Sequence, residues 1–141
     1  MAFSLRKKLG ELGERMACEE YLQRGYVLVA RNIYNHRGKQ MGEIDLIMRT
    51  ETELVFVEVK TRRNNKFGTG AEAVTKAKQR KLITVISWFS RRFPQYKYLQ
   101  PRIDVCVVEI APTFSPADQL GDLDKSRVNV IIIPDAVTTD Y

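Results

Sequence analysis

Hydrophobic positions recur along the chain with the period of a helix in two places. Residues 5–24 carry apolar side chains every three or four positions, and Gly25 fits the position just past the end of such a helix. Residues 71–90 follow the same pattern and predict a second helix. The inward-facing positions are Leu9, Leu12, Met16 and Tyr21 in the first helix, and Val74, Leu82, Val85, Ile86 and Phe89 in the second.

Five stretches rich in β-branched and aromatic residues predict strands, at residues 26–30, 42–49, 54–60, 102–110 and 128–133. Residues 50–53 form a hairpin loop, and the polar residues 31–41 and the turn-rich residues 64–70 predict longer loops. The order α-β-β-β-α-β-β predicts an α/β sandwich with a mixed central sheet. At 141 residues we expect a single domain, 1–141, with its core at about 8–133, a surface excursion at 111–127 and a tail at 134–141.

Two of these strands carry charges where buried strands are apolar. Asp45 interrupts the first, and Glu58 and Lys60 interrupt the second, two residues apart. Burying an unpaired charge costs several kcal/mol, so such groups need partners or a metal ion. Residues that break the pattern of their own strand often mark a functional site.

The hairpin loop predicts how these charges face one another. Pairing across a four-residue loop places Asp45 opposite Glu58 and Glu43 opposite Lys60, with Lys60 on the same face as Glu58. Two directly opposed carboxylates repel unless they share a proton or a divalent cation. The prediction depends on the loop length, because a slip of one residue would turn Asp45 to the other face.

Carboxylate oxygens are the ligands that Mg²⁺ and Mn²⁺ prefer, and such ions activate water and stabilise charge at phosphorus. Asp45 and Glu58 are therefore predicted metal ligands, and Glu14 of the first helix could add a third. Lys60 could orient or help to deprotonate the attacking water, or neutralise developing charge. With a single histidine, His36, and two cysteines, the chain offers no Ser–His pair and no Cys/His zinc cluster.

The net charge of +6 is concentrated in one part of the chain. Between Lys60 and Arg92 there are ten basic residues and one acidic residue, Glu72, which favours a nucleic-acid partner; no amphipathic anchor indicates a lipid surface. The candidate nucleic-acid-binding residues are Arg62, Arg63, Lys66, Lys76, Lys78, Arg80 and Lys81.

The cysteines and the short apolar runs bear on the compartment. Cys18 and Cys106 lie in apolar contexts without a C-x-x-C motif, which predicts two reduced, buried thiols in the cytoplasm. Residues 1–10 lack the apolar core of a signal peptide, and no apolar run is long enough to span a bilayer, so we expect no membrane partner.

Each candidate also has a structural interpretation. Asp45, Glu58 and Lys60 could form salt bridges on an exposed edge hairpin, and Glu14 could be a solvated helix residue. Gln79 and the basic run at 76–81 could be an ordinary helix surface. Asp104 could be the partner of a nearby Arg or Lys, and His36 a plain loop residue.

Several of these segments together resemble the YraN-like family of small bacterial proteins, which are similar to archaeal Holliday-junction resolvases of the PD-(D/E)xK, restriction-endonuclease-like superfamily. The resemblance covers roughly residues 8–110, and its most specific part is GEIDLI at 42–47 with VFVEVK at 55–60. This chain has Ile44-Asp45 where Pro-Asp often stands. The other matching segments are Gly10–Ala17, Tyr21-Leu22, Gly25-Tyr26, Arg31-Asn32, Ala73–Thr75, Lys78-Gln79 and Arg102–Val105.

The resemblance implies a restriction-endonuclease-like α/β/α sandwich, metal ligation by Asp45 and Glu58, and a catalytic role for Lys60. It also matches Glu14 to the first-helix acid of resolvases and Gln79 to a supporting catalytic glutamine. A homodimer acting on branched DNA in repair or recombination is implied as well. We therefore expect a Mg²⁺- or Mn²⁺-dependent DNA endonuclease selective for structure; a non-catalytic nucleic-acid-binding module and an RNA-processing nuclease remain alternatives.

Overall fold

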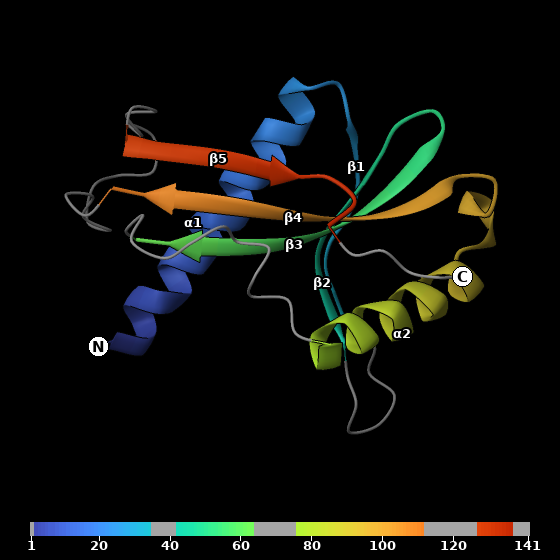
Figure 1. Cartoon of the computed structure of the whole chain (residues 1–141), viewed down its shortest axis with the longest axis horizontal. Helices are drawn as coiled ribbons and strands as arrows, with labels where there is room; N and C mark the ends of the chain where they lie inside the picture. The colour runs from blue at the N-terminus through green and yellow to red at the C-terminus, as the bar shows by residue number, and fades with distance from the viewer. Residues whose placement is uncertain (1, 35–41, 64–75, 112–126, 137–141) are drawn as a thin grey trace.

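The computed structural model of the chain describes residues 2–34, 42–63, 76–111 and 127–136, with side chains from residue 6 onward. Two helices and five strands follow in the predicted order (Figure 1). They are α1 (Ala2–Gln23), β1 (Val27–Tyr34), β2 (Glu43–Arg49), β3 (Glu53–Arg62), α2 (Lys76–Arg92), a 3₁₀ turn η2 (Pro94–Tyr96), β4 (Gln100–Ile110) and β5 (Val128–Ile133).

The strands form one mixed sheet in the order β1-β2-β3-β4-β5. Neighbouring strands are antiparallel except for β3 and β4, which run parallel and are connected through α2. Strands β2 and β3, which carry the unexpected charges, are therefore interior strands with a neighbour on each side. This placement excludes the exposed edge hairpin as an explanation of those charges.

The two helices cover opposite faces of the sheet (Figure 1). On one face, Tyr21 of α1 packs in a core with Val57 and other strand residues. On the other face, Phe89 of α2 packs in a second core with Phe56, at a ring-centroid distance of 5.8 Å. The alternation of β3 side chains between the two cores produces the predicted α/β/α sandwich.

Helix α1 ends as its sequence predicts. Gly25 has a φ of 90°, a conformation that residues with a Cβ rarely adopt. The Gly25 N–H donates to the Leu22 carbonyl at 3.0 Å, and the Tyr26 N–H donates to the Tyr21 carbonyl at 3.0 Å. These two bonds form a Schellman motif, which satisfies the last carbonyls of the helix and turns the chain into β1.

The predicted loop at 31–41 is wrong over its first four residues, because β1 continues to Tyr34. The polar Arg31 and Asn32 are exposed there, and an edge strand can pair its backbone on one side while such side chains face water. The 3₁₀ turn at Pro94–Tyr96 was also not predicted. Residues 35–41, 64–75, 112–126 and 137–141 lie outside the described residues, and with them His36, Lys66, the start of the second predicted helix and nearly all of the predicted excursion.

Both cysteines are free, buried thiols, as predicted. Burial raises the pKa of Cys106 to about 12, so this thiol stays protonated and unreactive at neutral pH. No helix in the described parts of the chain is long and apolar enough to cross a membrane.

Two glycines of α1 give a matched test of how closely this helix lies on the sheet. A Cβ at Gly13 would overlap Thr61 Oγ1 and lie 2.9 Å from Thr61 Cβ, whereas a Cβ at Gly10 would meet nothing within 4 Å. We expect Gly13→Ala to lower the free energy of unfolding by about 1–3 kcal/mol, since α1 must move away from β3. Gly10→Ala should raise it by up to about 1 kcal/mol, since alanine favours the helix. Urea denaturation measures both, and equal effects of the two substitutions would contradict the close contact.

Candidate active site

The predicted register of the β2–β3 hairpin is confirmed where the strands pair. The recorded pairs run from Arg49 and Leu54 to Leu46 and Val57, with no slip. The predicted pairing of Asp45 with Glu58 would come next, but it is not among the recorded pairs. Instead, Asp45 Oδ2 accepts a hydrogen bond from the Val59 backbone N–H at 2.8 Å. A carboxylate thus takes the place of a ladder carbonyl where the pairing ends.

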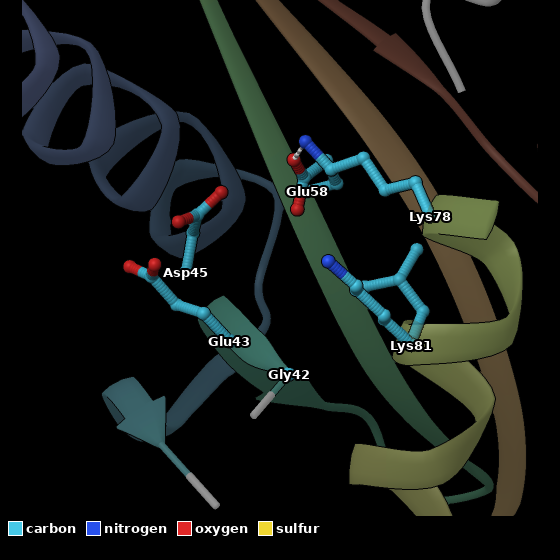
Figure 2. A pocket seen from close by; sticks show the side chains of 7 residues that line it. Gly42, Glu43, Asp45, Glu58, Lys78 and Lys81 are labelled. Carbon is cyan, nitrogen blue, oxygen red and sulfur yellow. Dashed lines mark ion pairs between the residues drawn. The ribbon is translucent and has the colours of Figure 1, made fainter. Parts of the chain in front are cut away.

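The side chains of β2 also stop alternating strictly between the two faces of the sheet at this point. Ile44 and Ile47, three residues apart, pack in the same core beneath α2, whereas Leu46 packs in the core beneath α1. The strict alternation assumed from the sequence is therefore broken around Asp45. This break places the Asp45 carboxylate between α1 and β3 (Figure 2).

Three carboxylates meet at this position. One oxygen each from Glu14 of α1 and from Glu43 and Asp45 of β2 lie within 4.8 Å of one another. We call these three residues the acidic cluster. Glu14 is half-buried, so its interpretation as a fully solvated residue is wrong. Glu43 was predicted to face Lys60, but the pairs between β2 and β3 end at Leu46 and Val57, and Glu43 joins the cluster instead.

Glu58 lies across from the acidic cluster and is neutralised by two lysines. Its carboxylate is nearly inaccessible, with 6% of the residue exposed. Lys60 of the same strand approaches Glu58 Oε1 to 3.5 Å, and Lys78 of α2 forms a closer ion pair with the same oxygen. Lys78, predicted only as a nucleic-acid contact, is thus built into the site.

A pocket of about 180 Å³ opens between these groups. Glu43 and Asp45 line one side of it, Lys78 and Lys81 of α2 line the other, and Glu58 lies between them (Figure 2). At roughly 30 Å³ for each water molecule, this volume holds a cation with its water molecules and a phosphate group. A pocket with an acidic side and a basic side suits a ligand that carries both positive and negative charge.

Gly42 brings the two sides together. A Cβ on Gly42 would overlap the Val85 side chain and lie 2.7 Å from the Lys81 carbonyl oxygen. The start of β2 therefore packs directly against the backbone of α2, which no residue with a side chain would permit without a shift. Gly42 of the GEIDLI segment thus allows β2 to approach α2 closely at the pocket that both elements line.

Negative charge on Asp45 and Glu14 is destabilised by their surroundings in the acidic cluster. Burial raises the pKa of Asp45 to about 7, and the negative charges of Glu58, Glu14 and Glu43 add to the effect against the stabilising Val59 N–H. Burial and the charge of Glu43 also raise the pKa of Glu14. A negative charge on Asp45 is therefore unfavourable in the metal-free fold, and a bound divalent cation would compensate it.

The two lysines that contact Glu58 shift in opposite directions. Burial and the nearby Lys78 lower the pKa of Lys60. Burial would lower the pKa of Lys78 too, but its hydrogen bonds with Glu58 and Lys60 outweigh burial and raise it. Lys78, whose ammonium is the closer of the two to Glu58 Oε1, is the main counter-ion of Glu58.

Two residues of β1, neither of them predicted as a site residue, also contact the acidic cluster. Asn32, with a φ of 48°, donates a side-chain hydrogen bond to Glu14. Tyr34 is 43% exposed beside Glu43, whose charge raises the pKa of its phenol. The unusual backbone at Asn32 is a conformation that asparagine tolerates better than most residues.

The remaining predicted residues lie around the pocket or away from it. Gln79 is half-buried on α2 and is not among the described residues that line the pocket. Lys76 and Arg80 are exposed on the first turns of α2, Arg63 is exposed after β3, and Arg62 is half-buried. Of the predicted basic run, Lys78 and Lys81 line the pocket, whereas Lys76 and Arg80 are exposed on the same turns of α2 but are not among the described residues that line it.

Asp104 is a structural residue. It is completely buried and binds Arg102 through two hydrogen bonds of 2.8 and 2.9 Å. The Tyr21 hydroxyl and the Asp135 N–H also donate to it, at 2.8 and 3.0 Å. The interpretation of Asp104 as the partner of a nearby arginine is confirmed, and its contact with Asp135 holds the start of the predicted tail against β4.

Comparison with known proteins identifies the family. The sequence profile described as "Uncharacterised protein family UPF0102" matches residues 13–108, which include α1 from Gly13 onward and all of β2 and β3. The chain belongs to the UPF0102 family. This is the YraN-like group that the sequence resembled.

Relatives in the UPF0102 family come from diverse bacteria. A UPF0102 protein of Symbiobacterium thermophilum is 43% identical over 109 residues, covering 75% of this chain and 86% of the relative. One from Acinetobacter baumannii is 33% identical over 134 residues, covering 95% and 97%. One from Caldanaerobacter subterraneus is 37% identical over 109 residues, covering 76% and 84%. Their names assign no activity, so function must be argued from the site.

Proposed function

We propose that this UPF0102 protein is a divalent-cation-dependent endonuclease that hydrolyses phosphodiester bonds in DNA. One observation carries the proposal: the carboxylates of Glu43 and Asp45 on β2 and the buried Glu58 on β3 face lysines of α2 across one pocket (Figure 2). A cation on the acidic side and a phosphate on the basic side would satisfy both sets of charges at once. Neither ligand alone would do so.

The acidic cluster fits Mg²⁺ or Mn²⁺. Oxygens that share such an ion at about 2.1 Å lie at most about 4.2 Å apart, so the three carboxylates within 4.8 Å need only small side-chain shifts. All the donors are hard oxygens, and Asp45 carries the raised pKa of a carboxylate whose charge is not yet compensated. Asp45 and Glu14 would hold the ion, with Glu43 or Glu58 completing the set.

The bound cation would supply Lewis acidity toward the phosphate and lower the pKa of a water molecule. The side chains around it have separate tasks. Asn32 orients Glu14 through its hydrogen bond, and the Val59 N–H orients Asp45. Lys60 places a positive charge beside Glu58, where it would stabilise negative charge that develops on the phosphate.

The basic surface favours recognition of nucleic-acid structure over base sequence. Lys76, Arg80 and Lys81 are exposed on the turns of α2 that begin beside the pocket. Long cationic side chains of this kind contact phosphates, which fix position on the nucleic acid but carry no sequence information. A branched DNA substrate, two copies of the chain acting together on it, and a role in repair or recombination are part of this proposal.

A cleavage assay with matched charge reversals tests the proposal. With Mn²⁺, the purified protein should cut DNA, with branched substrates cut faster than single-stranded DNA, duplex DNA or RNA. Lys76→Glu with Arg80→Glu should weaken DNA binding by about tenfold or more and reduce the dependence of log K on log salt by about 2, because two phosphate contacts are lost.

The control reverses Arg91 and Arg92, which are equally exposed but lie at the other end of α2. That double variant should bind DNA within about twofold of wild type at matched salt. Equal losses from both pairs would indicate attraction by net charge alone. Absence of cleavage with every substrate and divalent metal would refute the nuclease assignment.

A further inference from the structure

Lys78 has a position that the proposed nuclease function does not by itself explain. It belongs to α2, yet its ammonium forms an ion pair with the Glu58 carboxylate of β3, the closer of two lysine contacts with Oε1 (Figure 2). Glu58 is buried, and an unpaired buried carboxylate is costly. Lys78 therefore does for Glu58 what a metal ion would do in a metal-loaded site.

We propose that Lys78 is a built-in substitute for the divalent cation, which neutralises Glu58 in the metal-free protein and moves to a substrate phosphate when the cation binds. This inference rests on the proposed function, because it assumes that the acidic side of the pocket takes a divalent cation. It adds a residue that links metal binding to phosphate binding.

The geometry supports an exchange of partners within one pocket. Lys78 and Glu58 both line the pocket that Asp45 and Glu43 line from the other side. A cation that recruits Glu58 would compete directly with the Lys78 ammonium for the same carboxylate. The Lys78 ammonium would then lack its Glu58 partner while still lining the pocket, where a phosphate oxygen could accept its hydrogen bonds.

The neighbouring lysines define what is special about Lys78. Lys60 also contacts Glu58, but it is on the same strand and lies farther from the oxygen, at 3.5 Å. Lys81 lines the same pocket from the same helix and makes no ion pair among the described residues. Lys81 is thus the matched control, with the same charge, helix and pocket but without Glu58 as a partner.

The test measures Mn²⁺ affinity of the full chain in the absence of nucleic acid, by titration calorimetry. Lys78→Gln should bind Mn²⁺ about tenfold more tightly than wild type, because the competing ammonium is gone. Lys81→Gln should change the affinity by no more than about twofold. In a Glu58→Gln background, Lys78→Gln should have no effect on Mn²⁺ affinity, because the shared carboxylate has been removed.

A second measurement reports on the binding of DNA phosphates. With Ca²⁺ in place of Mn²⁺, Lys78→Gln should bind a labelled DNA duplex more weakly than wild type in fluorescence anisotropy. Tighter metal binding together with weaker DNA binding supports the exchange. Mn²⁺ affinity that is unchanged or reduced in Lys78→Gln overturns it while leaving a metal-dependent nuclease intact. Absence of any Mn²⁺ binding to wild type would instead refute the proposed function itself.

Discussion

Replacing Asp45 by asparagine is expected to abolish Mn²⁺-dependent DNA cleavage and, at neutral pH without metal, to make the protein more stable. Loss of cleavage follows because Asp45 lies in the acidic cluster and lines the pocket. Metal-ion catalysis is worth several kcal/mol, and each 1.36 kcal/mol is tenfold in rate, so the loss should reach about a thousandfold or more. The stability gain follows because the same carboxylate is an unfavourable charge in the metal-free fold.

The pKa of Asp45 gives the sign of that gain. It is raised from 3.8 to about 7 in the folded protein, so protonation of Asp45 favours folding. This stabilisation is complete below about pH 4 and is lost as the pH rises through about 7. At one pKa unit per 1.36 kcal/mol, the difference in unfolding free energy between Asp45→Asn and wild type should grow from near zero at pH 4 to at most about 4 kcal/mol at pH 8.

Mn²⁺ should reverse the order of stability. Wild type gains free energy of folding from any ion that binds only its native state, and Asp45→Asn lacks the site. Thermal or urea unfolding in EDTA and in millimolar Mn²⁺ measures both halves of the prediction. If Asp45→Asn were less stable than wild type in EDTA at pH 8, the carboxylate would be structural and the metal-site interpretation would fail.

Replacing Asp104 by alanine is expected to destabilise the fold by about 3–5 kcal/mol, the usual cost of removing one partner from a buried ion pair. Arg102 would lose two hydrogen bonds and keep those with Glu53 and Tyr26, and the Tyr21 hydroxyl would lose its acceptor. The effect should appear in urea as a lower midpoint with an unchanged m-value.

The matched control is Tyr21→Phe, which removes one hydrogen bond to Asp104 but leaves the ion pair, and should cost only about 1 kcal/mol. Mn²⁺ affinity of the folded Asp104→Ala protein should match that of wild type, since Asp104 lies outside the acidic cluster. A loss of Mn²⁺ affinity without a loss of stability would indicate that Asp104 belongs to the active site.

The sequence was sufficient to predict the framework of the site because that framework is local. Two apolar strands joined by a short loop fixed the register of β2 and β3, and the recorded pairs follow it. The end of the ladder was not predictable, because it depends on the Asp45 side chain bonding to the Val59 backbone. A prediction based on strict alternation of strand side chains does not include a side chain that replaces a backbone carbonyl as hydrogen-bond acceptor.

The contributions of Glu43, Asn32 and Lys78 required the tertiary structure. Asn32 and Lys78 lie on β1 and α2, whose positions relative to β2 and β3 are set by packing, such as the close contact of Gly42 with α2. Glu43 is on the same strand as Asp45, and its place in the cluster depends on the break in alternation around Asp45. A salt bridge between residues twenty positions apart leaves no periodic signal in a sequence. The pair of strands is therefore recognisable in the sequence of this chain, while the pocket becomes visible only in three dimensions.

The central claim is that a divalent cation binds to the carboxylates of this pocket. The most direct test is a crystal of the protein soaked in Mn²⁺, with data collected for anomalous scattering. Our account predicts an anomalous peak within about 2.2 Å of a carboxylate oxygen of Asp45, with Glu14 and either Glu43 or Glu58 as further ligands and Lys78 turned away from Glu58. A soaked crystal with no peak at Asp45, and with Lys78 still paired to Glu58, would contradict it.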